Sequence, residues 1–73
     1  MILEITGQTD DELTDRGLNW LGFALTQADA VNVAHEALGE LYAGRVTLQR
    51  LDDGVGRRHY AVWADCARPG PVI

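Results

Sequence analysis

The chain lacks lysine and serine altogether, and it has a single cysteine. Without lysine it has no phosphate-binding lysine for a Walker A loop and no amine for a Schiff base. Without serine it has neither a Ser–His–Asp triad nor a GxSxG nucleophile elbow. One cysteine forms no intramolecular disulfide, and together with two histidines it is too few for a closed zinc site. We therefore expect a protein that is not an enzyme and that holds no metal or other cofactor.

Long apolar runs are missing as well. No stretch reaches the roughly 18 apolar residues of a membrane-spanning helix, and no signal-peptide pattern is present, so we expect a cytoplasmic protein without a membrane partner. A chain of 73 residues forms one domain with a thin core, which a homodimer contact or a bound partner would enlarge. We assign residues 1–66 to this domain and residues 67–73 to a flexible tail, because Pro69 and Pro71 cannot continue a strand ladder.

The N-terminal third contains two predicted elements. Residues 1–5 are apolar and partly β-branched, which is typical of a strand. Thr9 and Glu12 have the spacing of a capping box, in which each side chain bonds the other residue's backbone N–H. This pattern predicts a short helix near residues 10–16.

Residues 18–25 fit two interpretations. In one, the first helix continues, because apolar residues recur at helical spacing. In the other, the segment is a strand with Leu21, Phe23 and Leu25 on one face. Gly22 weakens a long helix, since an interior glycine costs about 1 kcal/mol relative to alanine. Both interpretations stay open at this point.

A main amphipathic helix is predicted over residues 27–43. Thr26 is a favourable N-cap, and Gly44 is placed to end the helix. Its apolar stripe consists of Val31, Ala34, Leu38, Leu41 and Tyr42. Alternating strands at residues 46–49 and 59–64 flank a glycine-rich turn and predict a β-hairpin. The expected fold class is therefore α+β, with a small antiparallel sheet (the N-terminal strand plus the C-terminal hairpin) packed against helix 27–43.

The two faces of the predicted hairpin differ in chemistry. The face expected to pack on the main helix holds Val46, Leu48, Tyr60 and Val62. The opposite face combines aromatic, guanidinium and amide groups, a composition typical of interaction hot spots. In the alternative interpretation, the N-terminal segment covers Trp63, which then belongs to the core. The candidate partner-binding residues are Arg45, Gln49, Arg57, Arg58, His59 and Trp63.

The net charge of −5 is divided unevenly along the chain. Residues 1–44 hold most of the acidic side chains, whereas residues 45–73 hold five of the six arginines. One acidic cluster lies in the first predicted helix and could face a basic partner. The alternative is that these carboxylates serve helix capping and solubility. The acidic-surface candidates are Asp10, Asp11, Glu12 and Asp15.

Three motifs resemble functional sites but fail on spacing or context. His35 and Glu36 begin an HExxH zinc motif, but Gly39 stands where its second histidine would be. Asp52 and Asp53 lack the spaced ligands of an EF-hand. The glycine pair that follows them lies between two strands, which is the wrong context for a dinucleotide-binding loop.

These observations predict a small acidic protein–protein interaction module without enzymatic activity. It would act as an adaptor or inhibitor that docks on a larger protein or nucleoprotein complex, and its size and acidity suggest a phage or mobile-element origin. A second hypothesis is a nucleic-acid-binding or regulatory domain that uses the arginine-rich hairpin. The net charge opposes it, because phosphate neutralisation dominates such affinity. A third is a ligand-binding or enzyme-accessory homodimer.

Overall fold

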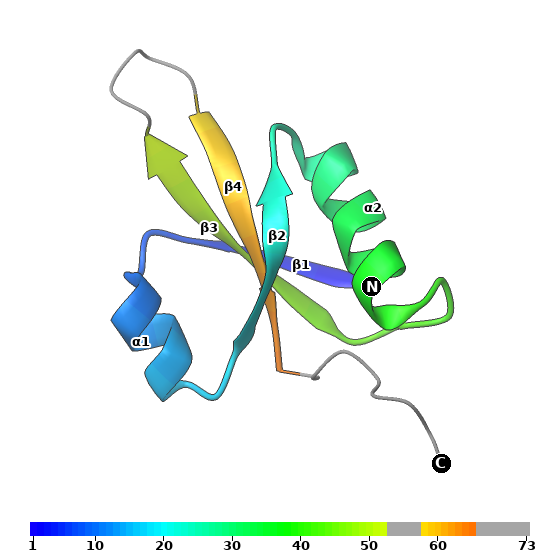
Figure 1. Ribbon diagram of the computed structural model, residues 1–73, viewed down its shortest axis with the longest axis horizontal. Coiled ribbons are helices and arrows are strands. Elements are labelled where there is room, and N and C mark those ends of the chain that lie inside the picture. The colour runs from blue at the N-terminus through cyan, green and yellow to red at the C-terminus, as the bar shows by residue number, and fades with distance from the viewer. Residues whose placement is uncertain (53–57, 66–73) are drawn as a thin grey trace.

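The computed structural model describes residues 1–52 and 58–65, and in these ranges it contains four strands and two helices. The chain order is β1 (Ile2–Thr6), α1 (Asp10–Asp15), β2 (Asn19–Ala24), α2 (Gln27–Leu38), β3 (Arg45–Asp52) and β4 (Arg58–Ala64) (Figure 1). The predicted α+β class is confirmed, as is the capping box of the first helix. The strand interpretation of residues 18–25 is the one that the structure adopts.

The four strands form one sheet in the order β1-β3-β4-β2. β3 and β4 form the predicted antiparallel hairpin, and β2 pairs antiparallel with the other side of β4. β1 pairs with β3 in parallel, so the sheet is mixed and not antiparallel throughout as expected. Parallel pairing is available here because α1, β2 and α2 lie between the two strands in the chain and provide the long crossover that it requires.

The second helix is shorter than predicted. α2 ends at Leu38, and Gly39 follows it with φ +95°, donating its backbone N–H to the carbonyl of His35 at 2.8 Å. Glycine adopts this positive φ at little steric cost, so the helix stops here and not at Gly44. Leu41, which was expected on the apolar stripe, is 97% exposed.

The sheet has a small core on each face. Against α2 lie the hairpin residues Val46, Leu48 and Val62, with Tyr60 packed beside them, as the alternation predicted. The buried residues of α2 are all alanines (Ala30, Ala34 and Ala37). Small side chains let the helix backbone approach the sheet closely, so the core is thin. On the opposite face, Leu13 of α1 packs against Ala61 and Trp63 of β4.

A β-bulge in β2 changes which of its side chains share a face. Trp20 pairs with Trp63 and Phe23 pairs with Ala61, with a register shift between Trp20 and Gly22. The extra residue places Trp20 and Phe23 on the same side of the sheet as α1. Leu21 packs against the core under α2, so the expected common face of Leu21 and Phe23 is wrong.

Replacing Gly22 with alanine should destabilise the fold. Gly22 has φ +151°, a conformation that side chains disfavour, and an added Cβ would lie 3.2 Å from Cγ1 of Val33 on α2. We expect the free energy of unfolding to fall by about 1–3 kcal/mol, measured by urea denaturation. Gly7→Ala is the matched control, because its Cβ would meet only the Arg50 guanidinium at 4.0 Å. Equal losses in the two variants would contradict this account.

Candidate functional site

A network of side-chain hydrogen bonds joins α1 to the sheet. The amide nitrogen of Gln49 on β3 donates to the Gln8 carbonyl at 3.1 Å and to the Asp10 carboxylate at 2.7 Å. Its amide oxygen accepts the indole N–H of Trp63 at 3.1 Å. Gln49 thus uses both of its donors and its acceptor, and it holds the start of α1 over the hairpin.

Two of the six partner-binding candidates are buried beneath α1. Trp63 is 7% exposed and Gln49 is 5% exposed, so neither side chain presents a contact surface. The interpretation in which the N-terminal segment covers Trp63 is confirmed, because Leu13 of α1 packs against the indole. The expectation that both residues lie on an open face is wrong.

The other four partner-binding candidates have separate locations. Arg45 is exposed and lies 3.9 Å from the Glu4 carboxylate, which Arg16 approaches to 3.3 Å. His59 is half-buried on β4. Arg57 and the side chain of Arg58 lie outside the described part of the structure. The hairpin candidates are therefore not brought together into one described surface.

The acidic candidates divide into two pairs. Asp10 accepts from Gln49, and Glu12 completes the capping box with Thr9, where both backbone-to-side-chain distances are 3.2 Å. Both carboxylates have structural roles, but only that of Glu12 agrees with the capping interpretation, since Asp10 bonds the Gln49 side chain of β3 instead. Asp11 and Asp15 are exposed on α1.

Three large, exposed apolar side chains come from β2 and the residue after it. Trp20, Phe23 and Leu25 are 52%, 62% and 68% exposed. The Trp20 and Phe23 rings meet edge to face with centroids 5.2 Å apart, and the Phe23 and His59 ring centroids are 6.1 Å apart. We call Trp20, Phe23 and His59 the aromatic row. Sequence reasoning missed it, although two aromatics in a strand beside a glycine were a usable signal of a bulge.

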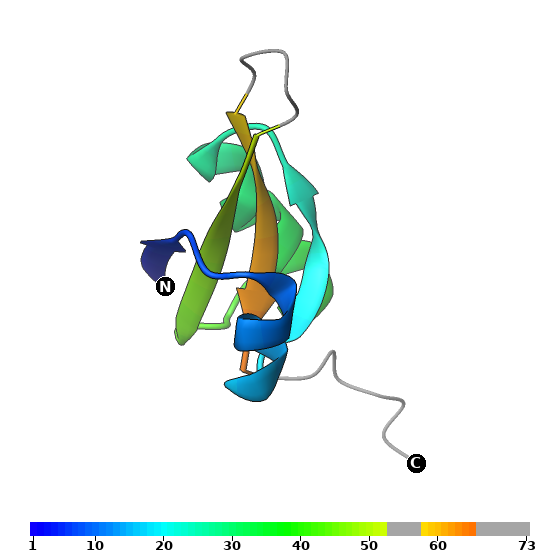
Figure 2. The same cartoon turned by 90° about the vertical axis from the view of Figure 1, so that its left-hand side faces the viewer.

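Trp20 and Phe23 of the aromatic row border a hollow of about 440 Å³ on the α1 side of the sheet, which we call the central pocket. Figure 2 looks toward this side and shows α1 crossing only one end of the strands. Ala61 pairs with Phe23 on one side and with Gln49 on the other, and its small side chain leaves space between these two larger residues. The residues that line the central pocket are Asp10, Trp20, Phe23, Gln49, Leu51, Ala61 and Trp63.

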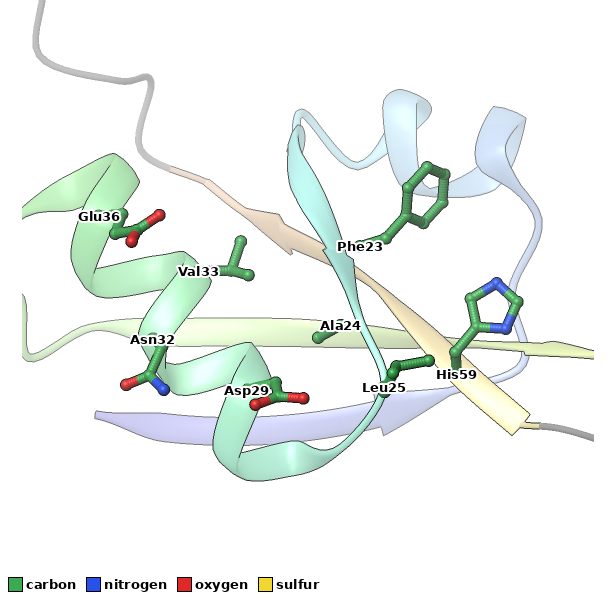
Figure 3. A pocket seen from close by; sticks show the side chains of 8 residues that line it. All are labelled: Phe23, Ala24, Leu25, Asp29, Asn32, Val33, Glu36 and His59. Atoms are coloured by element: carbon green, nitrogen blue, oxygen red, sulfur yellow. The ribbon is translucent and has the colours of Figure 1, made fainter.

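A second hollow, of about 350 Å³, lies between β2 and α2, and we call it the edge groove. In Figure 3, Phe23, Leu25 and His59 lie on one side of β2, and the α2 side chains lie on the other. β2 is the outermost strand of the described sheet, so no other described strand pairs with its outer edge. The residues that line the edge groove are Phe23, Ala24, Leu25, Asp29, Asn32, Val33, Glu36 and His59.

Charge is segregated across the sheet. Asp10 lines the central pocket, and Asp29 and Glu36 line the edge groove, whereas no arginine with a described side chain lines either one. Among the arginines with described side chains, Arg16 and Arg45 pair with Glu4 on β1, at the opposite edge of the sheet. The aromatic row therefore lies in acidic surroundings, although the isolated net charge does not reveal where the acids gather.

Within residues 1–52 and 58–65, no three His, Cys, Asp or Glu side chains are grouped as they would be to hold a metal ion. None of the helices described has the length and apolar character needed to cross a membrane. We found no matching family model, no similar curated protein and no similar solved structure. Function must therefore be inferred from the aromatic row and its two hollows.

Replacing Gln49 with leucine should destabilise the protein. The change leaves the buried Trp63 N–H without its acceptor, which costs about 1–3 kcal/mol of unfolding free energy. Adding Trp63→Phe removes that orphan donor, so the double variant should lose less than the sum of the single losses. Urea denaturation of the four proteins measures this coupling.

Gln27→Leu is the matched control, because Gln27 is exposed at the start of α2. Its unfolding free energy should stay within about 0.5 kcal/mol of the parent value. If the loss of unfolding free energy in the double variant equalled the sum of the losses from Gln49→Leu and Trp63→Phe, the indole–amide hydrogen bond would add nothing to stability.

Proposed function

We propose that this protein is a non-enzymatic protein-binding module, an adaptor or inhibitor that docks on a larger protein through the aromatic row. The observation that carries the proposal is the exposure of Trp20 and Phe23 on the edge strand β2, together with Leu25 directly after it. Contiguous exposed apolar surface marks interaction sites, and aromatic side chains are enriched in protein interfaces. Covering the exposed part of each ring would contribute about 1–2 kcal/mol.

The charges around the row favour a basic partner. Asp10, Asp29 and Glu36 border the two hollows beside it. A basic surface docked there would be attracted over distances up to the Debye length, about 8 Å at physiological salt. The same acids disfavour pairing of two copies through their β2 edges, because the acidic walls of the two edge grooves would meet.

The nucleic-acid hypothesis receives less support. Its stacking platform was Trp63, whose ring is buried under α1. The rings that are exposed, Trp20 and Phe23, lie beside carboxylates, which repel phosphate. A protein partner therefore fits the aromatic row better than a nucleic acid does.

Trp20→Asp should abolish docking while leaving the fold intact. The immobilised chain would be incubated with lysate of its source organism, and the retained proteins would be compared with those retained by the variant. We expect the specific partner to be lost, which corresponds to at least about a tenfold weaker affinity. Binding of that partner by the parent chain should weaken as ionic strength rises.

Leu41→Asp is the matched control, because Leu41 is 97% exposed and lines neither hollow. It makes the same chemical change away from the aromatic row and should retain the partner. Equal loss with both variants, or a chain that self-associates through Trp20 in sedimentation equilibrium and retains nothing else, would contradict the proposal.

A further inference from the structure

We propose that the central pocket receives an arginine side chain of the partner protein, an inference that rests on the proposed function and names what this surface recognises. The pocket has apolar walls and one anionic end. Trp20 and Phe23 form one wall, Ala61 and Trp63 contribute to the floor, and Asp10 provides the carboxylate. A side chain that fits this arrangement has an apolar stem and a cationic tip.

The aromatic wall suits a guanidinium group. Trp20 is about half exposed, so its indole is accessible from the pocket side of the sheet. A planar guanidinium stacks on aromatic faces and is more weakly hydrated than an ammonium, so it enters an apolar hollow at lower cost than lysine. The apolar floor would cover the methylene stem of the same side chain.

The carboxylate at the end of the pocket is already oriented. Oδ1 of Asp10 accepts the Gln49 amide at 2.7 Å, and Gln49 is itself held by Trp63. Among the described residues, no hydrogen bond reaches the second oxygen of Asp10, Oδ2. The donors of a guanidinium could therefore bond this carboxylate without breaking the contact that attaches α1 to the sheet.

The arginine side chains that the structure describes lie outside the pocket. Of the arginines with described side chains, none lines it, and Arg16 and Arg45 are paired with Glu4 at the β1 edge. The volume of about 440 Å³ lies in the range of small-molecule sites and exceeds the needs of one side chain, leaving room for apolar neighbours of the arginine. The preferred partner segment therefore carries arginine flanked by apolar residues.

The test uses two tripeptides that differ only in charge. Acetyl-Leu-Arg-Leu-amide and its citrulline analogue would be titrated into the full chain, following backbone and indole N–H signals by NMR. We expect the arginine peptide to shift the Trp20 indole and the Ala61 amide and to bind about fivefold more tightly than the citrulline peptide. Equal affinities, or no shifts at these positions up to the solubility limit, would overturn the proposal.

Asp10→Asn removes the negative charge but keeps an oxygen for Gln49, so the fold should persist, which thermal unfolding checks. It should weaken arginine-peptide binding about fivefold, so that the arginine and citrulline peptides bind with equal affinity. Asp11→Asn is the matched control, since it removes the same charge from the same helical turn at a residue that does not line the pocket. If Asp11→Asn weakened arginine-peptide binding equally, the Asp10 carboxylate would act only through the overall charge of the protein, and the proposed arginine site would be overturned.

Trp20→Leu keeps an apolar wall but removes the aromatic face. We expect it to lower the preference for arginine over citrulline while leaving Asp10 and Gln49 in place. An unchanged preference would overturn the role assigned to the indole. If the lysate partner is lost with Trp20→Asp but retained by Asp10→Asn, the arginine pocket fails while the proposed function stands.

Discussion

The buried side-chain amide of Gln49 is the contact on which this face of the molecule depends. It accepts the indole N–H of Trp63 and donates to the Gln8 carbonyl and the Asp10 carboxylate. These bonds let Leu13 cover one end of the sheet without leaving a buried polar side-chain atom unpaired among the described residues. Since an unpaired buried donor is costly, the amide determines both where α1 lies and how Asp10 is presented beside the central pocket.

The bulge in β2 supplies the other half of the surface. It turns Leu21 into the core under α2 and places Trp20 and Phe23 together on the opposite side. A regular strand would have sent these two aromatics to opposite faces, because side chains alternate along a strand. α1 is too short to cover them, so a row of exposed aromatic rings remains beside acidic side chains.

Much of the fold could be predicted because the relevant signals are local. The capping box at Thr9 needs residues only three apart, and the hairpin faces follow from strict alternation. The end of α2 was misjudged because Leu41 continues the helical spacing of apolar residues past Gly39, although glycine adopts the positive φ that ends the helix. The common face of Trp20 and Phe23 was not predicted, because the bulge adds one residue to the alternation of side chains along β2, and a regular two-residue period does not reveal a bulge.

By itself, the sequence determined the N-caps of both helices, the hairpin, its two faces and the absence of lysine- and serine-based chemistry. The tertiary structure decided the parallel pairing of β1 with β3, the burial of Trp63 and the exposure of Trp20 and Phe23. Caps and alternation depend on neighbours in the chain, whereas exposure depends on which distant element lies over a face. Whether an aromatic side chain becomes core or contact surface is therefore settled only when α1 docks on the sheet.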